Sequence, residues 1–107
     1  MIDEARLTEM KDAFGPEGFV ELFAIFRDET EDIITRLDQA EAEDLFAFLH
    51  AVRGSADNMG LPRLSSACRE GQARLRRGAS VDPDEVSACF RQSTNALADN
   101  LGLARPY

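Results

Sequence analysis

The sequence predicts an all-α protein, an antiparallel up-and-down four-helix bundle with an additional short N-terminal helix. Apolar residues recur at spacings of three and four along most of the chain, as they do on one face of a helix. The signs of β-structure are weak, because the chain has little strict alternation and no Asn-Gly or Asp-Gly hairpin turn. Glycine and proline interrupt the helical pattern after each stretch, and the short connections that result favour antiparallel neighbours.

The first two predicted helices meet at Gly15 and Pro16. The first is short and ends there, since a Gly-Pro pair interrupts a helix. The second is long and begins near Pro16, a residue that suits the first turn of a helix. The apolar stripe of the first helix is Leu7, Met10 and Phe14, and the stripe of the second is Phe19, Phe23, Phe26, Thr30, Ile33 and Leu37.

Three further helices complete the predicted bundle. The third should end at Gly60 and the fourth at Gly78, because glycine is common just after the last turn of a helix. Pro62 suits the first turn of the fourth helix, and Asp82 before Pro83 forms the N-cap of the fifth. The three apolar stripes are Leu45, Leu49, Val52, Ala56 and Met59, then Leu61, Leu64, Cys68, Gly71 and Leu75, then Val86, Phe90, Leu97 and Leu101.

The length of the chain fits one domain, so we assign residues 1–107 to a single unit with a bundle over about 16–101. Charged residues make up 30% of the sequence and no window has the apolar run of a membrane span, which predicts a soluble protein without a membrane partner. The first residues are acidic and lack the apolar region of a signal peptide, so we expect a cytoplasmic location. We also expect a monomer.

The charge is unevenly distributed. The net charge of -8 argues against binding to the phosphate backbone of nucleic acids. Residues 51–77, however, hold six arginines and two acids, a local balance of +4 that leaves -12 for the rest of the chain. One side of the protein is therefore suited to an acidic partner. For Arg74, Arg76 and Arg77 the alternative is an ordinary solvated helix face.

Cys68 and Cys89 stand alone in helix-like stretches, without a CxxC pair. We interpret them as small buried thiols rather than as a disulfide or a metal site. No metal site is predicted anywhere in the chain.

His50 is the only histidine of the chain. At about 100° per residue it lies about 140° from Leu45, outside the apolar stripe of its helix, so it should face solvent near the middle of that helix. Phe46, Arg53, Gly54 and Asp57 share this face. A glycine within a helix costs about 1 kcal/mol relative to alanine, and an exposed phenylalanine buries nothing in a monomer. Another protein that closes over His50 would compensate for both, with Gly54 leaving room and Phe46 providing an apolar contact.

The segment HAVRGSADNMG, from His50 to Gly60, resembles the signature of histidine-containing phosphotransfer (HPt) domains. The preceding GFVELFAIFRDETEDIITRL and the following LPRLSSACRE are also similar to that family, so the resemblance extends from Gly15 to about Arg77. It differs in two respects: Arg53 stands where lysine is more frequent, and Gly71-Gln72 replaces a common Leu-Glu pair.

The resemblance implies a phosphorelay protein that has no kinase activity of its own. His50 would accept a phosphoryl group from a receiver-domain aspartate and pass it to another receiver, while Arg53 offsets the charge. The Mg²⁺ of the reaction would belong to the receiver, so the chain itself needs no cofactor. A neutral imidazole is a sufficient nucleophile near pH 7 for attack on an aspartyl phosphate. Partners should cover Phe46, His50, Gly54 and part of the fourth helix, and Asp57 and Arg76 are further candidates for contact with the partner.

Gln72 and Arg76 are further candidates. His50 lies ten residues before Gly60 and Gln72 lies twelve after it, so an antiparallel hairpin brings both to a similar height. The amide of Gln72 would then orient the imidazole, as a glutamine does in some members of the family; the alternative is an exposed glutamine without a role. Arg76, one turn further, would contact the phosphate or the partner, or have no role.

Two other functions remain open. In the first, His50 is phosphorylated directly by a histidine kinase, as in the phosphoacceptor module of chemotaxis kinases. In the second, the chain is a helical adaptor without phosphate chemistry, which would leave His50, Arg53 and Gly54 unexplained. A hydrolase or metalloenzyme is least expected, because one histidine without a paired carboxylate-histidine motif does not build a usual site.

Overall fold

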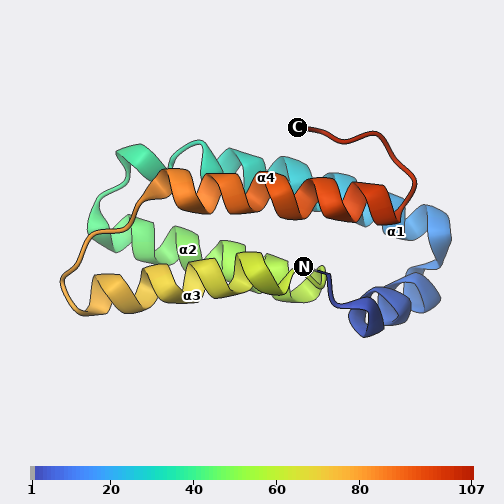
Figure 1. Ribbon diagram of the computed structural model, residues 1–107, viewed down its shortest axis with the longest axis horizontal. Coiled ribbons are helices and arrows are strands. Elements are labelled where there is room, and N and C mark those ends of the chain that lie inside the picture. Colours follow the sequence, from blue (N-terminus) through green and yellow to red (C-terminus); the bar gives the residue numbers. More distant parts are fainter. Residues whose placement is uncertain (1) are drawn as a thin grey trace.

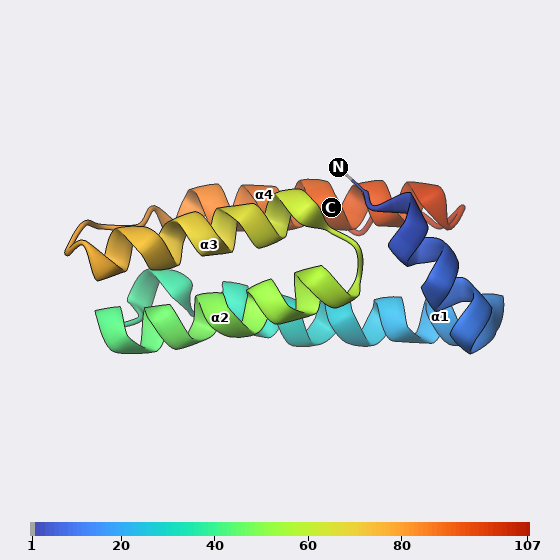
Figure 2. The same ribbon diagram turned by 90° about the horizontal axis from the view of Figure 1, so that it is seen from below.

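Four α-helices and one short 3₁₀ helix make up the computed structural model, which describes residues 2–107 and contains no strand within them. The helices are α1 (Glu4–Ile34), α2 (Ala42–Asn58), α3 (Pro62–Arg76) and α4 (Pro83–Asn100), and the 3₁₀ helix η1 covers Leu37–Gln39. They form a helical bundle that measures 43 × 23 × 18 Å (Figure 1). The turn between α2 and α3 lies at one end of the bundle, and the connection between α3 and α4 lies at the other (Figures 1 and 2). Within residues 2–107, none of the helices has the length and apolar character needed to cross a membrane.

The first helix differs from the two helices that the sequence predicts. It is one element from Glu4 to Ile34, but Gly15 interrupts it with a non-helical backbone at φ 75° and ψ 165°. A side chain would be strained at this φ, which only glycine adopts freely. The chain bends there, so that the segment 4–14 lies at an angle to the rest of α1 (Figure 2).

The segment before the bend is attached to the α2–α3 turn. The Asp3 side chain caps its first turn by accepting a hydrogen bond of 3.0 Å from the Arg6 backbone N–H. The backbone N–H of Asp3 donates to the carbonyl of Gly60 at 2.8 Å, and the side chain of Arg6 donates to the carbonyl of Asn58 at 3.0 Å. Leu7 is buried as predicted.

Three details of the first two predicted stripes are wrong, and one of them is that Ile33 is only half-buried whereas its neighbour Ile34 is buried. Phe14 is 54% exposed, because it directly precedes the bend at Gly15 and its ring no longer follows the buried face. The α-helix ends at Ile34, before the last residue of the predicted stripe. Leu37 nevertheless reaches the core, since η1 continues the chain in the same region.

The other helix ends follow the sequence. Gly60 and Gly78 come just after α2 and α3 and have positive φ, and Pro62 occupies the first turn of α3. The Asp82 side chain caps α4 by accepting from the backbone N–H of Asp84 at 2.9 Å.

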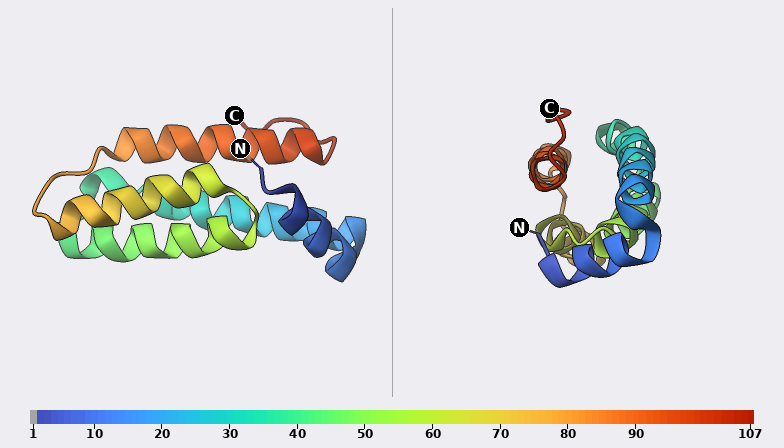
Figure 3. Two further views of the ribbon diagram at one scale, coloured as in Figure 1. Left: turned by 60° about the horizontal axis from the view of Figure 1, so that its bottom comes forward. Right: turned by 90° about the vertical axis from the view of Figure 1, so that its right-hand side faces the viewer.

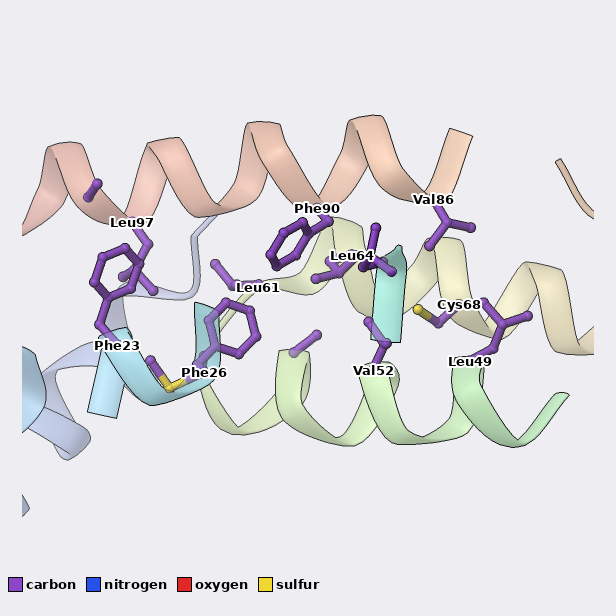
Figure 4. Packing of buried hydrophobic residues seen from close by; sticks show 14 of the residues in the cluster. Phe23, Phe26, Leu49, Val52, Leu61, Leu64, Cys68, Val86, Phe90 and Leu97 are labelled. Carbon is purple, nitrogen blue, oxygen red and sulfur yellow. The ribbon is translucent and has the colours of Figure 1, made fainter. Parts of the chain in front are cut away.

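The core lies between the four helices, and side chains from all of them point toward one another in Figure 4. The stripe of α2 is buried completely, from Leu45 to Met59. Leu75 and Leu101, the last members of the next two stripes, are only half-buried because they lie at the ends of the bundle. The labelled core residues are Phe23, Phe26, Leu49, Val52, Leu61, Leu64, Cys68, Val86, Phe90 and Leu97.

Candidate functional site

His50 lies near the middle of α2 and is exposed, as its position outside the apolar stripe predicts. Leu49 and Val52 are fully buried and fix the orientation of the helix, which turns His50 outward. Among residues 2–107, no side chain forms a hydrogen bond or an ion pair with the imidazole, and no group of His, Cys, Asp and Glu could hold a metal ion.

Arg53, one turn after His50, is held by Gln72 of α3. Its Nη1 donates a hydrogen bond of 3.2 Å to Oε1 of Gln72. Gln72 is only 2% exposed, so the α3 residue that fixes this guanidinium is itself fixed by packing. Gln72 is thus not an exposed glutamine. Its side-chain oxygen accepts a hydrogen bond from Arg53 and not from His50.

Gly54 leaves open space beside His50. A Cβ built on Gly54 would meet no atom within 4 Å. A side chain is therefore compatible with the fold at this position. The helix consequently gains nothing in packing from its glycine, while the surface next to the imidazole stays flat.

Phe46 is less exposed than the sequence predicts. The ring is half-buried, because the guanidinium of Arg76 on α3 covers it at 5.2 Å from the ring centroid. The sequence offered no signal for this contact beyond the proximity of the two helices. Phe46 and Arg76 thus form one composite surface one turn before His50.

Asp57 is engaged within the protein. Its Oδ1 accepts a hydrogen bond from the buried hydroxyl of Ser65, and its Oδ2 lies 3.8 Å from the Arg69 guanidinium. Both partners belong to α3, so Asp57 joins the two helices of the site. Ser65 is a residue that the sequence analysis did not single out.

The close approach of α2 and α3 depends on Gly71. A Cβ on Gly71 would lie 2.8 Å from Cδ1 of Leu49, a residue that is fully buried. A glycine at this position therefore lets α3 pack against the helix that carries His50. The site as a whole is a surface shared by α2 and α3.

Cys68 contributes no reactive thiol to this surface. Burial, followed by the nearby Cys89, raises the pKa of the Cys68 thiol to about 12, so Cys68 stays protonated and unreactive. Cys89 is only half-buried, so the prediction of a buried thiol is wrong there, and both cysteines are free.

The structure thus combines a helical bundle with one exposed histidine in mid-helix, which is followed one turn later by an arginine and a glycine. The family model described as Hpt domain matches residues 21–101, and the chain belongs to this family. Hpt domains act in histidine phosphotransfer within phosphorelays and interact with receiver domains and kinases. No curated protein and no solved structure matches the chain in the two other comparisons.

Proposed function

We propose that His50 accepts a phosphoryl group from the aspartyl phosphate of a receiver domain and transfers it to the aspartate of a second receiver. The observation that carries this proposal is the exposure of the chain's only histidine on α2, inside the region that matches the Hpt family. The chain acts as a phosphocarrier without kinase activity, as a monomer, in the cytoplasm where receivers are found.

The fold that we propose to support this role is the antiparallel up-and-down bundle of one domain, over about residues 16–101. The segment before Gly15 is then the additional N-terminal helix. The turns at alternate ends of the bundle support this arrangement (Figure 1).

The transfer needs few groups from this chain. An imidazole nitrogen attacks the phosphorus atom in line with the bond to the aspartate, and the electron pair of the broken P–O bond returns to the carboxylate. The ring gives its remaining N–H proton to water. Arg53, held by Gln72, balances charge on the transferred group. Mg²⁺ acts from the receiver, where it neutralises the phosphoryl oxygens of the donor.

The open surface at Gly54 and the composite surface of Phe46 and Arg76 lie on either side of His50 along α2. We propose that the receiver covers both, together with part of α3. The excess of arginine in residues 51–77 suits the acidic surroundings of a phosphorylated aspartate.

The test mixes phosphorylated receivers from the same cell with the parent protein, His50→Gln and Arg53→Ala in the presence of Mg²⁺. We expect an acid-labile, base-stable label on the parent, none on His50→Gln, and slower labelling of Arg53→Ala. Thermal unfolding provides the control for folding, since neither His50 nor Arg53 belongs to the apolar core.

Label on a folded His50→Gln protein would contradict the phosphohistidine proposal. Labelling of the parent by a histidine kinase, but by no receiver, would support direct phosphorylation instead. Labelling by neither would support the adaptor.

A further inference from the structure

The residues that follow α4 fold back along it. We call residues 103–107 the tail. Gly102, at φ 70°, reverses the chain directly after α4, and the backbone N–H of Leu103 donates to the carbonyl of Ala98 at 2.9 Å. The tail then lies on the side of α4 away from α3 (Figures 1 and 3).

Asn95 of α4 binds the backbone of the tail. Its Oδ1 accepts from the backbone N–H of Tyr107 at 3.1 Å, and its Nδ2 donates to the main-chain oxygen of the same residue at 3.3 Å. One side-chain amide thus satisfies both polar groups of one residue, as a neighbouring strand does in β-augmentation. This contact recognises the main chain of Tyr107 without regard to its side chain.

Asp99, one turn further along α4, binds a side chain of the tail. Nε and Nη2 of Arg105 donate to the two carboxylate oxygens of Asp99 at 3.0 and 2.8 Å. Exposed ion pairs contribute little in general, but this pair has the bidentate geometry that gives both energy and direction. The contact selects an arginine two residues before the residue that Asn95 holds.

The aromatic ring of Tyr107 completes the recognition. It packs edge-on against Phe90, with the centroids 5.6 Å apart and the planes at 63°. Phe90 in turn lies 6.1 Å from Phe26 of α1. The ring of Tyr107 therefore extends, toward solvent, an aromatic row that joins α4 to α1.

We propose that Phe90, Asn95 and Asp99 form a binding site for a short peptide segment with an arginine two residues before a tyrosine, and that the tail of the same chain occupies it. We call this site the tail site. Asp99 binds the arginine by charge, Phe90 contacts the ring of the tyrosine, and the amide of Asn95 binds the main-chain atoms of the same tyrosine. These contacts lie on α4, whereas the contacts around His50 lie on α2 and α3. The tail site is therefore separate from the phosphotransfer surface and does not rest on the proposed function.

The composition of the chain makes the tail easy to observe. Tyr107 is the only tyrosine of the chain and the chain has no tryptophan, so the tyrosine fluorescence of this chain reports on the tail alone. We would measure acrylamide quenching of this fluorescence in the parent, Asp99→Arg, Arg105→Asp and the double variant Asp99→Arg/Arg105→Asp. Asn95→Ala tests the backbone contact, and Gln92→Ala, at an exposed position on the same helix, is the matched control.

Quenching of the parent should be clearly weaker than that of N-acetyltyrosinamide. Each single charge reversal should raise the fraction of molecules with a detached tail about five-fold. This factor corresponds to the upper end of the stabilisation that an exposed ion pair provides. The double variant should return toward the parent, because the pair is restored in the opposite sense. Asn95→Ala should resemble the single reversals, and Gln92→Ala should resemble the parent.

Three results would overturn the proposal. The first is a parent Tyr107 as accessible as the free amide, and the second is a set of variants that quench like the parent. The third is a protection of Tyr107 from quenching that increases with protein concentration, together with dimers in sedimentation. This result would show that the tail of a second copy occupies the tail site.

Discussion

Arg53 and Gln72 are joined by a hydrogen bond of 3.2 Å that links an α2 side chain, one turn after His50, to a buried side chain of α3. A long arginine side chain loses considerable rotamer freedom when it is fixed in one place. Here the packing of Gln72 provides that fixed point before any partner arrives. We therefore propose that Gln72 is a positioning residue, which would act on a transferred phosphoryl group through Arg53.

Substitution of Gln72 by leucine should slow phosphotransfer to His50 about two- to ten-fold, the equivalent of one hydrogen bond of about 0.5–1.5 kcal/mol. The measurement is the rate of transfer from a phosphorylated receiver to Gln72→Leu, Arg53→Ala and the double variant. Because Gln72 acts through Arg53, the double variant should transfer no more slowly than Arg53→Ala alone. Additive losses would show instead that Gln72 acts on the imidazole or on the fold.

Gly54→Gln should slow transfer while it stabilises the bundle. Glutamine has a better helix propensity than glycine, by about 0.5–1 kcal/mol, and no atom lies near the position. Its side chain would, however, obstruct the approach of a receiver to His50. Urea unfolding and transfer kinetics on the same sample check the two effects.

Gly71→Ala is the control for Gly54→Gln, because it also replaces a glycine within a helix by a residue of better helix propensity. Its methyl group would press on Cδ1 of Leu49 in the core, and overpacking of this kind costs about 1–3 kcal/mol. We therefore expect it to be less stable than the parent, the opposite of Gly54→Gln. Equal stabilisation by both substitutions would contradict the close approach of α2 and α3.

Phe46→Ala should weaken the binding of a receiver about five- to ten-fold, as the loss of an aromatic contact of somewhat more than 1 kcal/mol would do. Phe48→Ala is a close control, since Phe48 is also half-buried and covered by an arginine, Arg36, at 5.3 Å. It lies two residues before His50 and so faces another side of α2. Titration calorimetry with a receiver domain distinguishes the two; equal losses would exclude a specific contact at Phe46.

The binding of the tail to α4 should weaken at alkaline pH. Burial first, and then the nearby Glu31 carboxylate of α1, raise the pKa of Tyr107 from its ordinary value of 10 to about 12, with Asp28 acting in the same sense and Arg27 in the opposite one. The pKa of Tyr107 is raised when the tail is bound to α4. The stabilisation of the bound tail by protonated Tyr107 is therefore fully present below pH 10 and is lost as the pH rises toward 12. The absorbance of tyrosinate at 295 nm should titrate above pH 10 in the parent and closer to 10 in Asp99→Arg.

The sequence predicted the helices well because glycine and proline act locally. Gly60, Gly78 and Pro62 determine helix ends through their own backbone preferences, and the stripe of α2 is buried as a whole. The prediction failed at Phe14, where the direction of the chain after Gly15, and not the helical period, decides what is buried.

The site was predictable in part for a similar reason. The exposure of His50 follows from its angle on the helix, which the sequence determines. Two contacts depend on the rotamers of long side chains, which the spacing of residues does not determine. Gln72 bonds to Arg53 rather than to His50, and the guanidinium of Arg76 covers the ring of Phe46. The tail has no helical period at all, so the contacts of Arg105 and Tyr107 became visible only in the structure.

The bend at Gly15 divides the molecule into parts that should open separately. The segment 4–14 is attached to the α2–α3 turn by a few hydrogen bonds and buries little beyond Leu7 and Met10, whereas the stripe of α2 is enclosed on all sides. Segments with few buried apolar contacts detach at a lower free energy than the core. In deuterium exchange, the amides of residues 4–14 should therefore exchange through a hinge opening at Gly15, while those of α2 exchange only when the whole bundle unfolds.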